Sequence, residues 1–397
     1  MRALLESIIS SNPINAAKDR ANDNMNTLYY LSFYKGRIAL YAFLDAMGIG
    51  KGDQVLMPAY TCVVVPNAVL YKGAQPVYVD IELDSFSVNP KPVEAALTPC
   101  VKAVLCQNTY GLSAHVDEIV ALCKERGIWS IEDCTHGFGG TYKGKPNGSY
   151  CDAAFYSSQW NKPFSTGIGG YALVNDASLA PKVKAFADAL PQPSLKTQAM
   201  LWVLLKVRSL VTPSTYYTMV NAYRWLSKKN LVTGSSSGEE IEGTTMPKHY
   251  LLGMSTVQRN AAQKAIKKLP ALNALRKANA AVFTQYLAEH GLNHVKPKYH
   301  NDHLFLKYPL LVKDRNAFFH YAQQAHIPLG DWFVSPLHPV TGDLSEWGFE
   351  PERYPNAVFA AAHVVNLPTD THHPDKVIAF LEKHADLIFD QTLEGRI

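Results

Sequence analysis

The chain has 397 residues, of which 47% are hydrophobic and 18% are charged, and its formal net charge is +4. This length and composition are typical of a globular protein with two lobes, and the mild charge argues against a nucleic-acid-binding protein. The six cysteines form no CxxC pair and the first residues show no signal-peptide pattern, so we expect reduced thiols in a cytoplasmic protein.

Helical and strand patterns alternate through the first half of the chain. An apolar helical face begins near Gly36 and ends at Gly48, where a glycine can stop a helix. The pattern then predicts strand Gln54–Met57, helix Val63–Leu70, strands Pro76–Asp80 and Val101–Leu105, helix Val116–Lys124, and strands Gly127–Ile131, Ala153–Ser157 and Tyr171–Val174. Alternating helices and apolar strands indicate an α/β fold with a mostly parallel sheet covered by helices.

Residues 191–245 have a different character, and we expect an atypical helical insertion there. The run 201–211 is apolar nearly all round, but Lys206 and Arg208 interrupt it and Pro213 ends it. Spanning a bilayer needs about 20 apolar residues, so this run is not a membrane span. We expect a helical hairpin that packs on its own dimer. Contact of residues 196–229 with a membrane surface or a partner is the open alternative, because basic residues interleave with aromatic ones.

Two polar side chains follow predicted strands at the positions where open α/β sheets bind ligands. The acidic pair Glu132-Asp133 follows the strand that ends at Ile131, and Lys162 lies in a polar hook after Ser157. An aspartate and a lysine at neighbouring strand ends suit pyridoxal phosphate, as the partner of the pyridine nitrogen and as the Schiff-base amine. On spacing alone, a helix-capping Asp133 and a solvated Lys162 are an equally good interpretation.

Several ordered motifs resemble the DegT/StrS family of sugar aminotransferases, which are pyridoxal-phosphate enzymes of the aspartate-aminotransferase fold (fold type I). The motifs are the run 36–80, Glu132-Asp133-x-x-His136-Gly137, Lys143–Gly148 and the run 157–170. The likeness is densest over residues 31–176 and resumes more weakly over 246–384. It implies a large cofactor-binding domain over residues 1–245 and a smaller α+β domain over residues 246–397.

The resemblance also implies which residues bind the phosphate of the cofactor. Gly36 begins the helix whose backbone amides bind phosphate in the family, and Ser157 matches a phosphate-binding serine. Arg37 stands where the family usually has a small hydroxyl residue. It either pairs with the phosphate by charge-assisted hydrogen bonds or points to solvent.

Other positions implied by the resemblance surround the cofactor ring. His136 falls where a glutamine or histidine contacts the phenolic oxygen. Cys62 stands where an aromatic ring usually lies over the pyridine, so either its thiol packs there or Tyr60 swings in. In the second lobe, Leu251 replaces an asparagine that reaches the partner subunit's phosphate, and Phe333 replaces a histidine of the substrate loop.

Together these matches imply a pyridoxal-phosphate aminotransferase that converts a nucleotide-linked keto-deoxysugar to an amino sugar. Glutamate is the expected amino donor, and a homodimer is the expected assembly. The alternatives are a sugar dehydratase of the same family and a non-catalytic cofactor-binding regulatory protein. Family dehydratases carry a histidine in place of the lysine, so Lys162 favours amino transfer. We expect no metal site, because the adjacent His372 and His373 lack further ligands at metal spacing.

Overall fold

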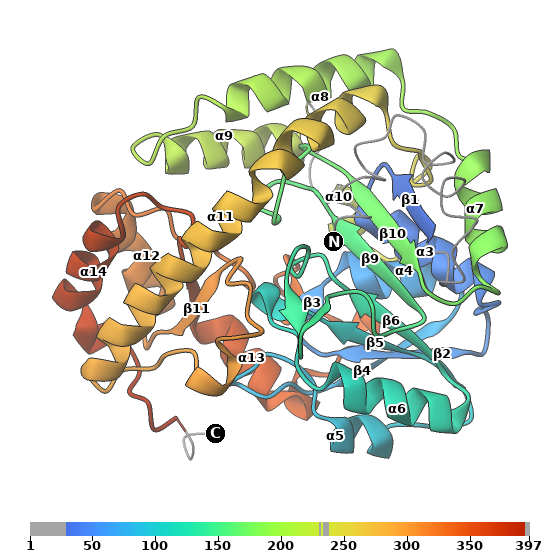
Figure 1. Ribbon diagram of the computed structural model, residues 1–397, viewed down its shortest axis with the longest axis horizontal. Helices are drawn as coiled ribbons and strands as arrows, with labels where there is room; N and C mark the ends of the chain where they lie inside the picture. Colours follow the sequence, from blue (N-terminus) through green and yellow to red (C-terminus); the bar gives the residue numbers. More distant parts are fainter. Residues whose placement is uncertain (1–28, 230–231, 233–237, 394–397) are drawn as a thin grey trace.

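The computed structural model describes residues 29–229, 232 and 238–393 and has a seven-stranded sheet in its larger lobe (Figure 1). The strand order is β1-β10-β9-β6-β5-β2-β4. These strands are β1 (Tyr29–Phe33), β2 (Gln54–Pro58), β4 (Gln75–Val79), β5 (Val101–Gln107), β6 (Trp129–Asp133), β9 (Ala153–Ser157) and β10 (Gly170–Val174). The pairs from β4 to β9 are parallel, whereas β10 and β1 add an antiparallel edge. The prediction of a mostly parallel sheet is confirmed.

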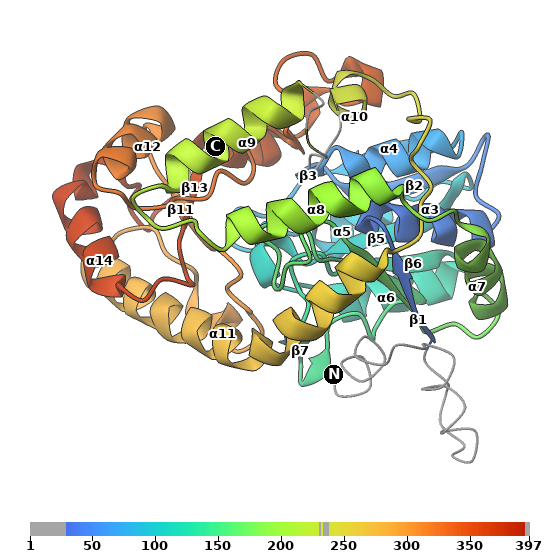
Figure 2. The same cartoon turned by 90° about the horizontal axis from the view of Figure 1, so that it is seen from above.

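Helices cover this sheet in two groups. One group contains α3, α4 and α7, and the other contains α5 and α6, with contacts inside each group (Figure 2). Their bounds are α3 (Gly36–Ala46), α4 (Val64–Tyr71), α5 (Pro90–Ala95), α6 (Val116–Arg126) and α7 (Ala180–Ala189). Every helix and strand that we predicted before residue 175 is present, with ends that differ by at most two residues. Helix ends commonly differ by this much between pattern and hydrogen bonding.

A long helix leads into the smaller lobe. Helix α11 (Thr256–Glu289) begins with a capping box, in which Ser255 and Gln258 each bond the other's backbone amide. The other elements are β11 (Tyr308–Leu311), α12 (Arg315–Gln324), α13 (Pro355–His363), β13 (Val364–Leu367) and α14 (Pro374–Lys383). Residues between 280 and 388 form a hydrophobic core of this lobe. Leu337, Trp347 and Ala357 pack instead into the core of the large sheet, and the boundary at residues 245/246 stays a prediction.

Short elements complete the described chain. The two-residue strands β3 (Thr61–Cys62) and β12 (Leu337–His338) pair in parallel, so the second lobe contacts the first beside Cys62. The remaining short elements are β7 (Thr141–Tyr142), β8 (Lys145–Pro146), η1 (Thr109–Gly111), η2 (Pro297–Tyr299), η3 (Ser345–Trp347), η4 (Pro351–Arg353) and η5 (Ala385–Leu387).

The segment predicted as a helical insertion is helical. Helices α8 (Leu195–Arg208) and α9 (Tyr216–Lys228) form an antiparallel hairpin on one side of the molecule, and α10 (Gly238–Glu242) follows (Figures 1 and 2). The hydroxyl of Ser194 accepts a hydrogen bond of 3.2 Å from the amide of Thr197 and so caps α8. None of the helices in the described residues has both the length and the apolarity of a membrane span.

Candidate active site

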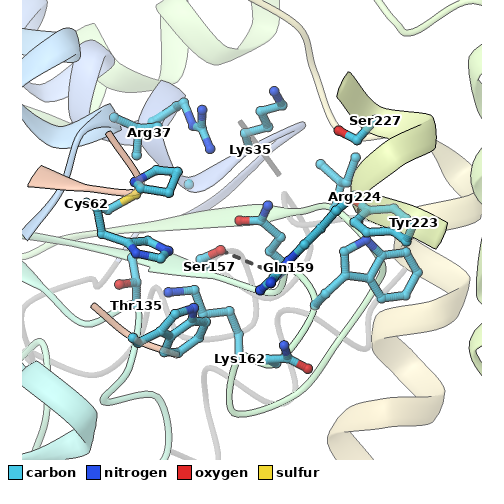
Figure 3. A pocket seen from close by; sticks show the side chains of 18 of the residues that line it. Lys35, Arg37, Cys62, Thr135, Ser157, Gln159, Lys162, Tyr223, Arg224 and Ser227 are labelled. Carbon is cyan, nitrogen blue, oxygen red and sulfur yellow. Dashed lines mark hydrogen bonds between the residues drawn. The ribbon is translucent and has the colours of Figure 1, made fainter. Parts of the chain in front are cut away.

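A cavity of ≈ 720 Å³ lies where the carboxyl ends of β6 and β9 meet the start of α3 and the α8–α9 hairpin. Figure 3 shows the side chains gathered around it. Of the residues predicted to bind the cofactor, the cavity is lined by Gly36, Arg37, Cys62, Asp133, Ser157 and Lys162. These residues lie up to 126 positions apart in the sequence, and the parallel sheet brings them to one edge.

Asp133 is the last residue of β6, between β5 and β9. Its side chain is only 3% exposed, and its Oδ1 accepts a hydrogen bond of 2.9 Å from the amide of Thr135. Burial raises the pKa of Asp133, while the Thr135 bonds and the positive charge of Lys162 act in the opposite direction. A carboxylate in this place can accept a hydrogen bond from a protonated pyridine nitrogen.

Lys162 lies in the hook between β9 and β10. Backbone hydrogen bonds close the hook, from the amide of Ser158 to Gly169 at 2.9 Å and from the amide of Thr166 to Ser158 at 2.7 Å. Gly167 has φ +80° there, a conformation that glycine adopts without strain. Burial lowers the pKa of Lys162 to about 8, although Asp133 acts to raise it. An appreciable minority of this amine is therefore neutral near physiological pH and able to act as a nucleophile.

The start of α3 and the end of β9 form a cradle for an anionic group. A methyl group at Gly36 would lie 2.8 Å from the carbonyl oxygen of Tyr156, so only glycine lets the helix approach the strand this closely. The N-terminus of a helix offers amide groups and a favourable dipole to phosphate. Ser157 lies beside it, and the side-chain nitrogen of Gln159 is buried without a hydrogen-bond partner among the described residues. These groups fit a phosphate that needs donors.

Gln159 was missed from the sequence. A signal was present, because Gln159 lies two positions after Ser157, just beyond the carboxyl end of β9, where open α/β sheets bind ligands.

Arg37 does not point to solvent, so that alternative is wrong. It is 6% exposed, and its Nη1 donates a hydrogen bond to Oε1 of Glu240, which lies in α10 and is buried too. Lys35 donates to Oε2 of Glu240 at 3.4 Å, and the side-chain amide of Asn67 donates to the backbone oxygen of Glu240 at 2.8 Å. Arg37 is thus held at the wall of the cavity by a carboxylate that the sequence did not indicate, and its contact with a phosphate stays a prediction.

Tyr60 and His136, which we predicted to contact the cofactor ring, are not among the residues that line the cavity, and these two contacts stay predictions. The Tyr60 hydroxyl is buried and shares a hydrogen bond of 2.7 Å with the Tyr110 hydroxyl, so Tyr60 does not swing into the cavity. His136 accepts a hydrogen bond of 3.1 Å at Nδ1 from the amide of Tyr110, and its ring stacks on Trp332 with centroids 4.7 Å apart. These partners hold His136 behind the wall, whereas Trp332 and Cys62 belong to the wall itself.

The second lobe supplies the wall opposite β6. The Lys162 amine lies 4.5 Å from the ring centre of Trp332, and Phe333 and His338 also line the cavity. Phe333 packs on Tyr60 with ring centroids 5.0 Å apart, so the residue that replaces the family histidine is an apolar part of the wall. Leu251 packs half-buried against the large core, outside the lining.

The hairpin closes the remaining side and brings positive charge. Arg208 of α8 donates a hydrogen bond of 2.6 Å to the side-chain oxygen of Asn161, beside Lys162. Arg224 of α9 forms an ion pair with Asp331, next to Trp332. Two guanidinium groups at the mouth of a cavity attract an anionic substrate.

Comparison with known proteins gives a family match over most of the chain. The model of the DegT/DnrJ/EryC1/StrS aminotransferase family matches residues 17–198 and 238–379. The chain is 34% identical to GDP-perosamine synthase of Escherichia coli over 168 residues, which are 42% of this chain and 46% of that protein. It is 37% identical to UDP-2-acetamido-2-deoxy-3-oxo-D-glucuronate aminotransferase of Pseudomonas aeruginosa over 171 residues, 43% of this chain and 48% of that protein. The chain thus spans about half the length of these curated relatives.

The fold has solved counterparts. A DegT DnrJ EryC1 StrS aminotransferase from Brucella abortus matches with a TM-score of 0.70 at 19% identity, over 96% of this chain and 94% of that one. This likeness confirms the predicted aspartate-aminotransferase-like fold. The hairpin falls mostly within residues 199–237, between the two ranges that the family model matches.

Proposed function

This chain belongs to the DegT/DnrJ/EryC1/StrS aminotransferase family, and from that membership we propose that it is a pyridoxal-phosphate-dependent sugar aminotransferase. Its substrate is a nucleotide-linked keto-deoxysugar, which becomes an amino sugar, and glutamate is the amino donor. The names of the two curated relatives support a nucleotide-linked sugar. The arginines at the mouth of the cavity suit the negative charge of such a substrate.

The observation that carries the proposal is the placement of Asp133 and Lys162 on one cavity beside the start of α3. Pyridoxal phosphate, when bound, accepts the electrons of a carbanion formed at the substrate. Gly36, Ser157 and Gln159 hold the phosphate, and Asp133 keeps the pyridine nitrogen protonated. Lys162 binds the cofactor covalently and, once released, moves a proton to or from the reacting carbon of the substrate.

Two other functions compete with amino transfer. A sugar dehydratase would use the same cavity, but Lys162 can return a proton to the sugar carbon, which favours the amine as product. A cofactor-binding regulatory protein would keep the cavity without turnover. We further propose a cytoplasmic homodimer with its active sites at the subunit interface, in which Leu251 does not supply the family's contact across subunits.

The experiment loads the purified chain with pyridoxal phosphate and reduces it with borohydride before peptide mapping. Attachment of the cofactor to the peptide with Lys162 is expected, and attachment to another lysine would refute the assignment. Glutamate added to the unreduced protein should convert the cofactor to its amine form with release of 2-oxoglutarate. A panel of nucleotide-linked keto-sugars should then give an amino-sugar mass, whereas a deoxy-keto product would indicate the dehydratase.

A further inference from the structure

The outer face of the α8–α9 hairpin exposes large apolar side chains. Trp202 is 54% exposed, Leu210 73% and Trp225 59%. In the described part of the chain, ten large hydrophobic side chains are exposed, and six of them lie between residues 195 and 225. A concentration of this kind on a surface element marks a contact with another molecule or a membrane.

The inner face of the same hairpin already has its partners. The Trp160 indole nitrogen donates a hydrogen bond of 2.9 Å to the Tyr223 hydroxyl, and the Tyr217 hydroxyl donates one of 2.6 Å to the backbone oxygen of Ile327. Leu204 and Met219 line the cavity. The hairpin is therefore fixed against its own chain through one face, and the apolar residues of the other face need a different explanation.

The charge of this segment is entirely positive. Between Asp188 and Glu239 the sequence has no acidic residue, and it has six basic ones: Lys196, Lys206, Arg208, Arg224, Lys228 and Lys229. The other 32 basic residues of the chain are outnumbered by its 34 acidic residues. The net positive charge of the protein therefore arises from this one segment. Arg208 and Arg224 line the cavity, and the exposed Lys196, Lys206 and Lys229 favour an anionic partner for the outer surface.

Among anionic partners, a membrane surface suits the exposed tryptophans as well as the lysines. Trp202 and Lys206 are exposed four positions apart on α8, Lys196 is exposed in the first turn of the same helix, and the Lys206 amine lies 5.5 Å from the ring centre of Trp202. Tryptophan rings prefer the boundary between acyl chains and headgroups, where lysines can extend to phosphate. The hairpin is too short and too polar to span a bilayer, and a helical surface with exposed tryptophans and lysines can lie in the plane of such an interface.

Contact with a second copy of the chain is a weaker explanation for the exposed apolar and basic side chains of the outer face. A two-fold interface centred on this face places the same patch against itself. Here that would bring two basic surfaces together without an acidic residue from this segment to neutralise them. Repulsion between like charges opposes this arrangement.

We propose that the outer face of α8 and α9 binds the surface of a bilayer that contains anionic phospholipids. The hairpin lies in the interface with Trp202 and Trp225 at the level of the headgroups, and the inner face continues to line the cavity. This inference goes beyond the proposed function and stands on the hairpin alone, so it can fail while aminotransfer holds.

The test is co-sedimentation of the full-length protein with vesicles of phosphatidylcholine alone and of phosphatidylcholine with phosphatidylglycerol. We expect binding to the anionic vesicles that falls as salt is added. Lys196→Gln/Lys206→Gln should lower the partition coefficient about 30-fold, since each basic residue near an anionic surface contributes about one factor of five. Trp202→Ser/Trp225→Ser should also abolish most of the binding.

The matched control is Lys267→Gln/Lys268→Gln, two exposed lysines on α11 that carry the same charge change outside the α8–α9 hairpin. Its partition coefficient should stay within about twofold of that of the unmodified protein, since these lysines lie outside the proposed contact. Cofactor binding of each variant shows that it is folded, because none of the substituted residues lines the cavity. Equal affinity for neutral and anionic vesicles, or no binding to either, would overturn the proposal. A hairpin variant that dissociates a dimer without changing vesicle binding would assign the face to a second copy.

Discussion

Replacing Arg37 by alanine tests whether the buried pair with Glu240 is structural, catalytic or both. The substitution removes the Arg37 guanidinium from the buried carboxylate of Glu240, while the Lys35 amine stays 3.4 Å from it. Removing one partner of a buried ion pair typically costs 3–5 kcal/mol. Because Lys35 remains, we expect the lower end, a loss of about 3 kcal/mol in the free energy of unfolding. Urea unfolding of the cofactor-free protein measures it without a contribution from bound ligand.

The same variant reports on the phosphate. If Arg37 also bonds the phosphate of the cofactor, Arg37→Ala should weaken cofactor binding by about 1.5–3 kcal/mol, the range for a hydrogen bond to a charged group. The double variant Arg37→Met/Glu240→Gln leaves neither an unpaired guanidinium nor an unpaired carboxylate. It should recover most of the stability, while cofactor binding stays weak.

Two results would refute this reasoning. A loss of stability below about 1 kcal/mol for Arg37→Ala would mean that the pair is solvated like a surface pair. A double variant that binds cofactor as tightly as the unmodified protein would remove Arg37 from the phosphate site.

Three further predictions concern the cavity. Gln159→Met should leave the stability of the cofactor-free protein unchanged or higher, because the amide nitrogen has no partner there, yet it should weaken cofactor binding by about 1.5–3 kcal/mol in a titration. The rate at which the apoprotein captures pyridoxal phosphate should rise with a midpoint near the pKa of Lys162, about 8, because only the neutral amine attacks; a flat profile from pH 6 to 10 would contradict this. Gly36→Ala should cost about 1–3 kcal/mol in urea unfolding, because its methyl group would meet the Tyr156 carbonyl at 2.8 Å.

The sequence indicated the sheet, its helices and the two central residues because those signals are local. Asp133 follows an apolar strand and Lys162 follows another, and parallel strands of one sheet must end at the same edge. The pattern of apolar residues in each strand and the positions of the glycines are visible in the sequence without any contact between distant residues. Their positions beside one cavity were therefore predictable, because the position of each residue relative to its own strand determines where it lies at the edge of the sheet.

The parts that could not be predicted depend on contacts between distant residues. Glu240 pairs with a residue 203 positions earlier, and no pattern around either residue indicates the other. The orientation of His136 depends on Trp332 and on the amide of Tyr110, neither of which belongs to its motif. The orientation of Tyr60 likewise depends on its bond with the Tyr110 hydroxyl.

The hairpin and the phosphate cradle are parts of one arrangement. Helix α10 follows α9 in the chain and carries Glu240, which holds Arg37 at the cavity wall. The inner face of α8 and α9 lines that cavity, while the outer face is the one proposed to meet a membrane. An anionic surface that attracts the exposed Lys196 and Lys206 therefore acts on an element whose other face lines the cavity. Membrane binding should then change the affinity for the cofactor, and the coupling between the two binding events must be equal in both directions.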